Sequence, residues 1–216
     1  MRHKKFLLST IIATGVLIVA VATILFGSTS SESMSDAPQP KQPEVSSGEL
    51  AATLPLFHPV DENYFRGSQP QRGGIGTLTR LGVKTLVDLR SIYDHTDDVR
   101  TVAESAGLGY RWIPMSVWTP PTDDDTNKFV ALVTDTAKGP FFVFCGDGLN
   151  RTGEMTAIYR VAHDHWSVEK ALDEADEIGF NPYYYTLRNY VWDYARKFHP
   201  LAVPREGRRS VATESL

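Results

Sequence analysis

The chain has very little cysteine and no surplus of basic residues. Its 216 residues include one cysteine, Cys145, which excludes an internal disulfide, so the fold must be stabilised by core packing. Lysine and arginine number 22 against 26 aspartate and glutamate residues, giving a formal net charge of -4. The chain thus has no excess of positive charge that could neutralise the phosphates of a nucleic acid, and we expect no nucleic-acid partner. The lone thiol is therefore either inert core filler or a reactive group.

The one long apolar run lies at the N-terminus. Residues 6–27 carry no charge and are long enough, as a helix, to cross a bilayer, and Arg2, Lys4 and Lys5 precede them. This predicts a membrane-spanning signal anchor within residues 1–27, with a cytoplasmic N-terminus and an extracytoplasmic remainder, periplasmic or at the cell surface. Signal cleavage, giving a secreted protein, is the alternative; the length of the run and the lack of a clean cleavage site disfavour it.

The rest of the chain divides by composition. Residues 28–53 are rich in serine, proline and glutamine with few large apolar side chains, which predicts a disordered linker. A folded domain is expected over 54–198, followed by a polar, flexible tail over 199–216.

Within the domain, apolar segments rich in aromatic and β-branched residues predict strands at 84–90, 110–117 and 140–145. Helical patterns separate or follow them, at 74–82, from Thr122, and at 152–164, 167–178 and 182–198. Alternating strands and helices predict a single α/β domain with a mostly parallel central sheet flanked by helices. We expect the tyrosine-rich last helix to pack on the core.

A glycine-rich loop connects the strand that ends at Cys145 to a helix that opens with Arg151 and Thr152. The backbone amides of such a loop, the N-terminal end of the helix and a planar guanidinium together form a site for a tetrahedral oxyanion. The same field favours an ionised thiolate. An inert buried cysteine is the competing interpretation.

This loop resembles the Cys-x5-Arg-Ser/Thr loop of the cysteine-based tyrosine and dual-specificity phosphatases. Cys145, Gly148, Arg151, Thr152 and Gly153 fall on the pattern. Further segments resemble bacterial relatives of the plant and fungal atypical dual-specificity phosphatases, namely 63–70, 81–90, 112–117 and 157–180. The resemblance implies a compact α/β phosphatase domain that acts on phosphate monoesters without a metal or other cofactor.

Carried onto this chain, the resemblance implies that Cys145 attacks phosphorus and forms a phosphocysteine. Arg151 and the loop amides would hold the phosphoryl oxygens, and Thr152 would hydrogen-bond the sulfur. The implied phosphate-binding residues are Gly146, Asp147, Gly148, Leu149, Asn150, Arg151 and Thr152.

Two departures from the family pattern concern catalysis. Phe144 stands where the family usually has histidine before the nucleophile. The usual general-acid aspartate is absent from 116–119, so Asp123 or Asp124 is the candidate acid, with Asp147 and the more distant Asp94 as rivals. Thr122 and Asp125 also form a capping-box pattern, which explains acidic residues here without any catalytic role.

The substrate side leaves several hypotheses open. Asp147 and the absence of lysine in the loop favour phosphotyrosine, or another simple phosphomonoester on a protein or small molecule, over inositol phosphates, although Arg66, Arg72 or Arg90 could line the rim. A catalytically weak phosphate-binding module is the main alternative, and sulfur transfer or redox chemistry on Cys145 is a further one. His163 and His165 lack a third ligand at useful spacing, so no metal site is predicted.

Overall fold

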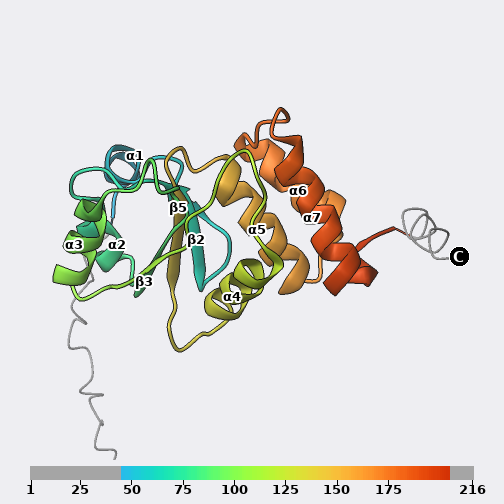
Figure 1. The fold of residues 1–216 in the computed structure, drawn as a ribbon. Helices are drawn as coiled ribbons and strands as arrows, with labels where there is room; N and C mark the ends of the chain where they lie inside the picture. Colours follow the sequence, from blue (N-terminus) through green and yellow to red (C-terminus); the bar gives the residue numbers. More distant parts are fainter. Residues whose placement is uncertain (1–44, 205–216) are drawn as a thin grey trace, which may run out of the picture. The chain divides into compact units, whose positions relative to one another are not determined.

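The computed structural model describes residues 45–204, and every structural statement below concerns this part of the chain. Figure 1 shows its helices and strands. The helices are α1 Ser47–Thr53, α2 Gly74–Arg80, α3 Asp97–Ser105, α4 Asp123–Val133, α5 Asn150–Ala162, α6 Val168–Ile178 and α7 Tyr185–Phe198, followed by the 3-10 turn η1 Pro200–Ala202. The strands are β1 His58–Pro59, β2 Tyr64–Ser68, β3 Thr85–Asp88, β4 Gly109–Trp112 and β5 Phe141–Cys145.

The five strands form one sheet in the order β1-β2-β5-β3-β4. Only β1 pairs antiparallel, with β2; the β2–β5, β3–β5 and β3–β4 pairs are parallel. The predicted α/β domain with a mostly parallel sheet is therefore confirmed. Because parallel strands end at one edge, the segments that follow β2, β3, β4 and β5 meet there, which is where ligands bind in open α/β sheets.

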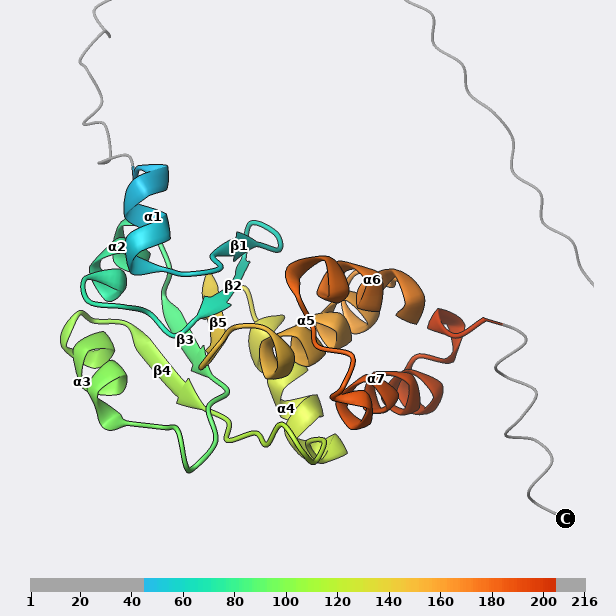
Figure 2. The same cartoon turned by 90° about the horizontal axis from the view of Figure 1, so that it is seen from above.

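The side chains of β5 alternate between two cores, one on each face of the sheet. Phe141, Val143 and Cys145 join the core formed with α4, α5, α6 and α7. Phe142 and Phe144 join the other core, formed with α2, α3 and the residues after α1. Figures 1 and 2 show these two helical layers on opposite sides of the strands.

Helix α5 is the centre of the larger layer, because it packs against β5, α4, α6 and α7. Its residues from Asn150 to Val161 are all buried, including Glu154. Neither carboxylate oxygen of Glu154 has a hydrogen-bond partner among the described residues. Burial raises the pKa of Glu154 well above its usual value, so this carboxyl is protonated in the folded protein over a wider pH range than in the unfolded chain.

Several elements differ from the sequence predictions. β1, β2 and α1 were not predicted, and α1 occupies the end of the segment assigned to the 28–53 linker; α3 provides the helical stretch expected, without bounds, between the strands at 84–90 and 110–117. Ser46 caps α1 by accepting a hydrogen bond from the Glu49 amide, and α1 contacts α2. In α7, Tyr190 and Tyr194 are buried as expected, whereas Tyr185, its first residue, and Tyr183, two residues before it, are exposed.

The predicted membrane anchor at residues 6–27 lies outside the described residues. Among residues 45–204, no helix has both the length and the apolar character needed to span a bilayer.

Candidate active site

Cys145 is the last residue of β5 and lies opposite Ser68 of β2 in the parallel register. Its side chain is buried, and the Gly148 amide donates a hydrogen bond to Sγ over 3.2 Å. Gly148 has a φ of 73°, and a Cβ at this position would lie 2.5 Å from backbone atoms of Gly67 and Ser68. Glycine is therefore required here both by conformation and by the close approach of β2.

The shape of the loop is set by β2 and the residue that follows it. Three consecutive loop carbonyls accept hydrogen bonds from that side: Gly146 O from Gln69 N at 3.2 Å, Asp147 O from Ser68 Oγ at 2.8 Å, and Gly148 O from Arg66 Nη2 at 2.8 Å. In a planar peptide the N–H points opposite to the C=O. The amides of residues 147, 148 and 149 are therefore directed away from β2, as an anion-binding nest requires.

Arg66, which donates a hydrogen bond to Gly148 O, is fully buried, with 1% of its surface exposed. Burial lowers the pKa of its guanidinium, and its Nε and Nη1 have no partner among the described residues. Arg90 is equally buried and pairs with Asp88, Nη2 lying 2.6 Å from Oδ2. The suggestion that Arg66 or Arg90 lines the rim of the site is therefore wrong, whereas Arg72 is exposed.

Arg151, in the first turn of α5, is 7% exposed and lies beside the loop. Its Nη2 is 2.8 Å from Asp94 Oδ2 and its Nη1 is 3.3 Å from Asp94 Oδ1, while Nη1 also reaches Leu89 O at 3.5 Å. Burial alone would lower the pKa of Arg151, but the hydrogen bonds to Asp94 and the nearby Cys145 raise it overall. The guanidinium is therefore a fixed, permanent cation.

A cavity of about 510 Å³ opens above Arg151. Its walls come from the segments that follow β3 and β4, and they are largely apolar. The lining residues are Ser91, Ile92, Tyr93, Asp94, Pro114, Met115, Ser116, Val117, Trp118 and Arg151. Ile92, Tyr93 and Trp118 are exposed in the described structure, so large apolar side chains stand at the mouth of a site whose base is cationic.

The predicted acids lie elsewhere or are already paired. Asp123 accepts hydrogen bonds from Tyr190 Oη at 3.0 Å and from Lys197 Nζ, and Lys197 lowers its pKa. Asp124 forms an ion pair with Lys128 at 2.5 Å, and neither aspartate lines the cavity above Arg151. Asp147 belongs to the loop with an exposed side chain, whereas Asp94 does line the cavity.

The remaining loop residues support the helix entry. Asn150 Oδ1 accepts a hydrogen bond from the Asn181 amide at 3.0 Å, which ties the start of α5 to the segment after α6. Thr152 Oγ1 is buried without a hydrogen-bond partner among the described residues. Thr122 is confirmed as the N-cap of α4, because the Asp125 amide donates to Thr122 Oγ1 at 3.2 Å, while the Asp125 carboxylate accepts from the Thr122 hydroxyl at 2.7 Å.

Phe144, which replaces the usual histidine, packs on the face opposite Cys145. Its ring stacks with Phe142 at 5.8 Å, and the guanidinium of Arg90 lies 5.5 Å from its centroid. Asp88 binds that guanidinium and also accepts a hydrogen bond from Tyr110 Oη at 2.5 Å. Behind the nucleophile strand there is thus a buried ion pair, which the sequence analysis did not identify.

Sequence reasoning also missed the structural role of Arg66 and the pairing of Asp94 with Arg151. Arg66 stands in the segment 63–70 that carries part of the resemblance, which was the one signal that marked it. Asp94 had no comparable signal, because its partner lies 57 positions away in the chain.

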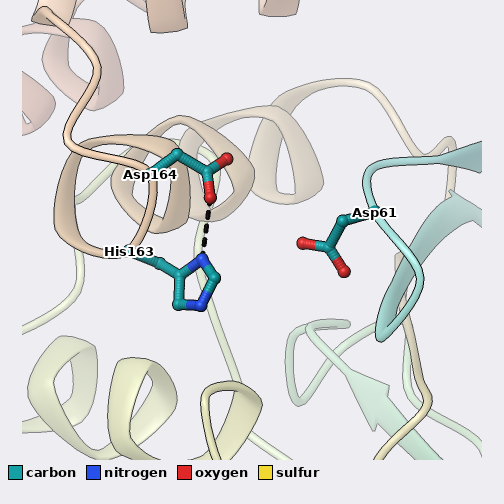
Figure 3. Close-up of side chains that lie close together, drawn as sticks. All are labelled: Asp61, His163 and Asp164. Carbon is teal, nitrogen blue, oxygen red and sulfur yellow. Dashed lines mark hydrogen bonds and ion pairs between the residues drawn. The ribbon is translucent and has the colours of Figure 1, made fainter.

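A separate polar cluster lies on the far end of α5, where His163, Asp164 and Asp61 place ligand atoms within 4.8 Å of one another (Figure 3). Asp164 already accepts from Arg160 Nη1 and pairs with His163 Nδ1, both at 2.7 Å. Asp61 accepts from the Asn63 amide and from Tyr159 Oη, also at 2.7 Å. His165 is not part of the cluster, and hydrogen bonds within the described chain account for all four carboxylate oxygens.

Comparison with protein families places this geometry in context. The family model described as "DSP-PTPase phosphatase fused to NAD+ Kinase" matches residues 56–184. The dual specificity protein phosphatase TpbA of Pseudomonas aeruginosa is 32% identical over 123 residues, which are 54% of this chain and 51% of TpbA. NAD kinase 2, chloroplastic, of Arabidopsis thaliana is 30% identical over 101 residues, 45% of this chain and 10% of that protein. The chain thus spans about half the length of TpbA and a tenth of the plant protein.

Solved structures share the fold. The crystal structure of P. aeruginosa TpbA has a TM-score of 0.56 at 24% identity, covering 64% of this chain and 84% of that one. TpbA in complex with phosphotyrosine has a TM-score of 0.51 at 25% identity, covering 58% and 74%. The catalytic core of the PP-IP phosphatase SIW14 from S. cerevisiae has a TM-score of 0.58 at 19% identity, covering 69% and 93%.

Proposed function

The chain belongs to the DSP-PTPase phosphatase family, and we propose that it hydrolyses phosphate monoesters through a phosphocysteine on Cys145. The thiolate Sγ attacks phosphorus, an S–P bond forms, and the bond from phosphorus to the ester oxygen breaks. The leaving oxygen takes a proton from solvent. Water then cleaves the S–P bond, which releases inorganic phosphate, regenerates the thiolate and returns one proton to solvent. The inward amides and Arg151 stabilise the charge on the equatorial oxygens.

The observation that carries this proposal is the orientation of the loop after Cys145, whose carbonyl groups face β2. Three successive carbonyls are bonded to the β2 side, so the amides of residues 147, 148 and 149 point away from β2. The Gly148 amide donates to Sγ, and Arg151 is buried beside the loop. A merely structural cysteine requires no such arrangement.

We propose phosphotyrosine, or another aryl phosphomonoester, as the substrate class. The apolar cavity with Tyr93 and Trp118 suits an aromatic ring, and TpbA, a relative, has been solved with phosphotyrosine. A highly phosphorylated ligand is less well suited, because Asp94 and Asp147 place carboxylates at the site while Arg66 and Arg90 are buried in the fold.

The test is turnover by the full-length chain purified in detergent. Hydrolysis of 4-nitrophenyl phosphate and of a phosphotyrosine peptide should be inhibited by vanadate, and Cys145→Ser should lower kcat by at least about a thousandfold. An inactive wild-type chain that still binds phosphate would instead identify a phosphate-binding module. Preference for an inositol polyphosphate over the peptide would refute the proposed substrate class.

We further propose that residues 6–27 anchor the chain in a membrane, with the catalytic domain outside the cytoplasm. The uncharged run and the basic residues before it support this orientation. Protease added to intact cells, after opening of any outer membrane, should degrade the domain while a cytoplasmic marker survives. Full protection of the domain would contradict the proposed orientation.

A further inference from the structure

We propose that Asp94 is a positioning residue that holds Arg151 by one edge of its guanidinium and leaves the other edge for the phosphoryl group. This inference rests on the proposed phosphatase function and assigns a role to a carboxylate at the same site. It differs from general-acid catalysis, for which Asp94 was a distant candidate.

The planar guanidinium of Arg151 can hold an oxyanion by either of two edges. A guanidinium offers two donor pairs suited to an oxyanion, the end pair Nη1–Nη2 and the side pair Nε–Nη2. Asp94 occupies the end pair with contacts of 3.3 and 2.8 Å. Arg151 Nε is buried and has no partner among the described residues. The side pair is therefore the one left to receive phosphate oxygens.

The Asp94–Arg151 ion pair also lies beside Gly146 in the loop. A Cβ built on Gly146 would lie 3.6 Å from both Arg151 Nη2 and Asp94 Oδ2. Gly146 directly follows the nucleophile, so the ion pair flanks the first residue of the anion-binding loop. Holding a planar donor at this place fixes the oxyanion in line with Sγ, and displacements of about 1 Å can cost a hundredfold in rate.

Asp94 is itself held in place by the turn after β3. Ser91 Oγ donates a hydrogen bond to Asp94 Oδ1, and the His95 amide closes the turn by donating to Ser91 O at 2.9 Å. Partial burial alone would raise the pKa of Asp94, but hydrogen bonds from Arg151 and Ser91 lower it overall. An ionised carboxylate is what a fixed anchor for arginine requires, whereas a general acid must carry a proton.

Three roles for Asp94 predict different kinetics, which the variants Asp94→Asn, Asp94→Ala and Asp94→Glu can separate. Asp97→Asn is the matched control, because this exposed aspartate lies three residues later, in the first turn of α3. The full-length chain is assayed with 4-nitrophenyl phosphate, which has a good leaving group, with phenyl phosphate, which has a poor one, and with vanadate as an inhibitor.

A positioning role predicts that Asp94→Ala lowers kcat/KM about tenfold to a hundredfold for both substrates alike and weakens vanadate inhibition by a similar factor. Asp94→Glu should recover most of this loss, and Asp97→Asn should behave as wild type. A loss confined to phenyl phosphate, together with disappearance of the basic limb of the pH profile, would identify a general acid and overturn the inference. Tighter vanadate binding in Asp94→Asn would identify a competing anion and overturn it too.

Coupling to Arg151 provides the decisive measurement. If Asp94 acts through Arg151, then Asp94→Asn should have almost no further effect in an Arg151→Lys background. Additive losses in the double variant would refute the positioning role. Should the wild-type chain not turn over, the proposed function fails, and vanadate affinity measured by calorimetry on the same variants still decides the role of Asp94.

Discussion

Replacing Glu154 with glutamine should stabilise the protein at neutral pH. The side chain is fully buried, both oxygens lack partners within the described structure, and burial raises its pKa well above the usual value. Between the unfolded pKa, near 4.3, and the raised folded pKa, the folded state binds more protons than the unfolded state. The free energy of unfolding therefore falls as pH rises through this window.

The size of the effect follows from linkage. The free energy of unfolding falls by about 1.4 kcal/mol for each pH unit inside the window. Glutamine keeps the shape of the side chain but does not titrate. The difference in unfolding free energy between Glu154→Gln and wild type should thus grow by about 1.4 kcal/mol for each pH unit within the window.

Urea unfolding followed by tryptophan fluorescence at pH 5, 6 and 7 measures this difference directly. Other titrating groups are common to both chains and cancel in the comparison. Glu177→Gln is the matched control for the loss of one carboxyl group, because Glu177 is an exposed residue of α6. Glu154→Met removes the same charge without adding an amide that needs partners. If neither Glu154 variant changes the pH slope, the assigned protonated state is wrong.

Three further variants test the loop and the excluded acids. Gly148→Ala should lower the free energy of unfolding by roughly 3 kcal/mol, because the added Cβ combines a positive φ with a clash against the β2 backbone. Thermal unfolding would measure this loss, and an unchanged Tm would contradict the loop geometry. Arg66→Met should lower kcat/KM about tenfold or more, because Gly148 O loses its partner, and wild-type kinetics in this variant would show that the carbonyl needs no anchor. Asp123→Asn should change kcat/KM less than about threefold for phenyl phosphate, since this residue lies outside the cavity, and a loss near a hundredfold would restore it as the acid.

The sequence predicted the parts of the fold that depend on local pattern. The strands near 84–90, 110–117 and 140–145, the Thr122 cap and the last three helices are all present, with ends that differ by a few residues. β2 was missed because Arg66 and Gly67 interrupt its apolar pattern, and its burial comes from pairing with β5. α3 was expected only as a helical stretch without bounds, because just two of its residues, Val99 and Ala103, are buried.

Local pattern also identified the loop itself, since its residues are contiguous. The contacts that orient it are not contiguous: Arg66 and Gly148 are 82 positions apart, and Asp94 and Arg151 are 57 apart. The sequence analysis treated Arg66 and Arg90 as possible surface residues, like Arg72, because the sequence alone does not reveal which charged side chains the sheet will bury. Only the three-dimensional pairing separates these buried arginines from Arg72.

The last two residues of β5 lie on opposite faces of the sheet and belong to different cores. The side chain of Cys145 lies on the face of the sheet that carries α5, whereas Phe144 is fully buried in the core on the other face. Exchanges at 144 therefore change the packing behind the nucleophile strand without altering a residue that lines the cavity above Arg151.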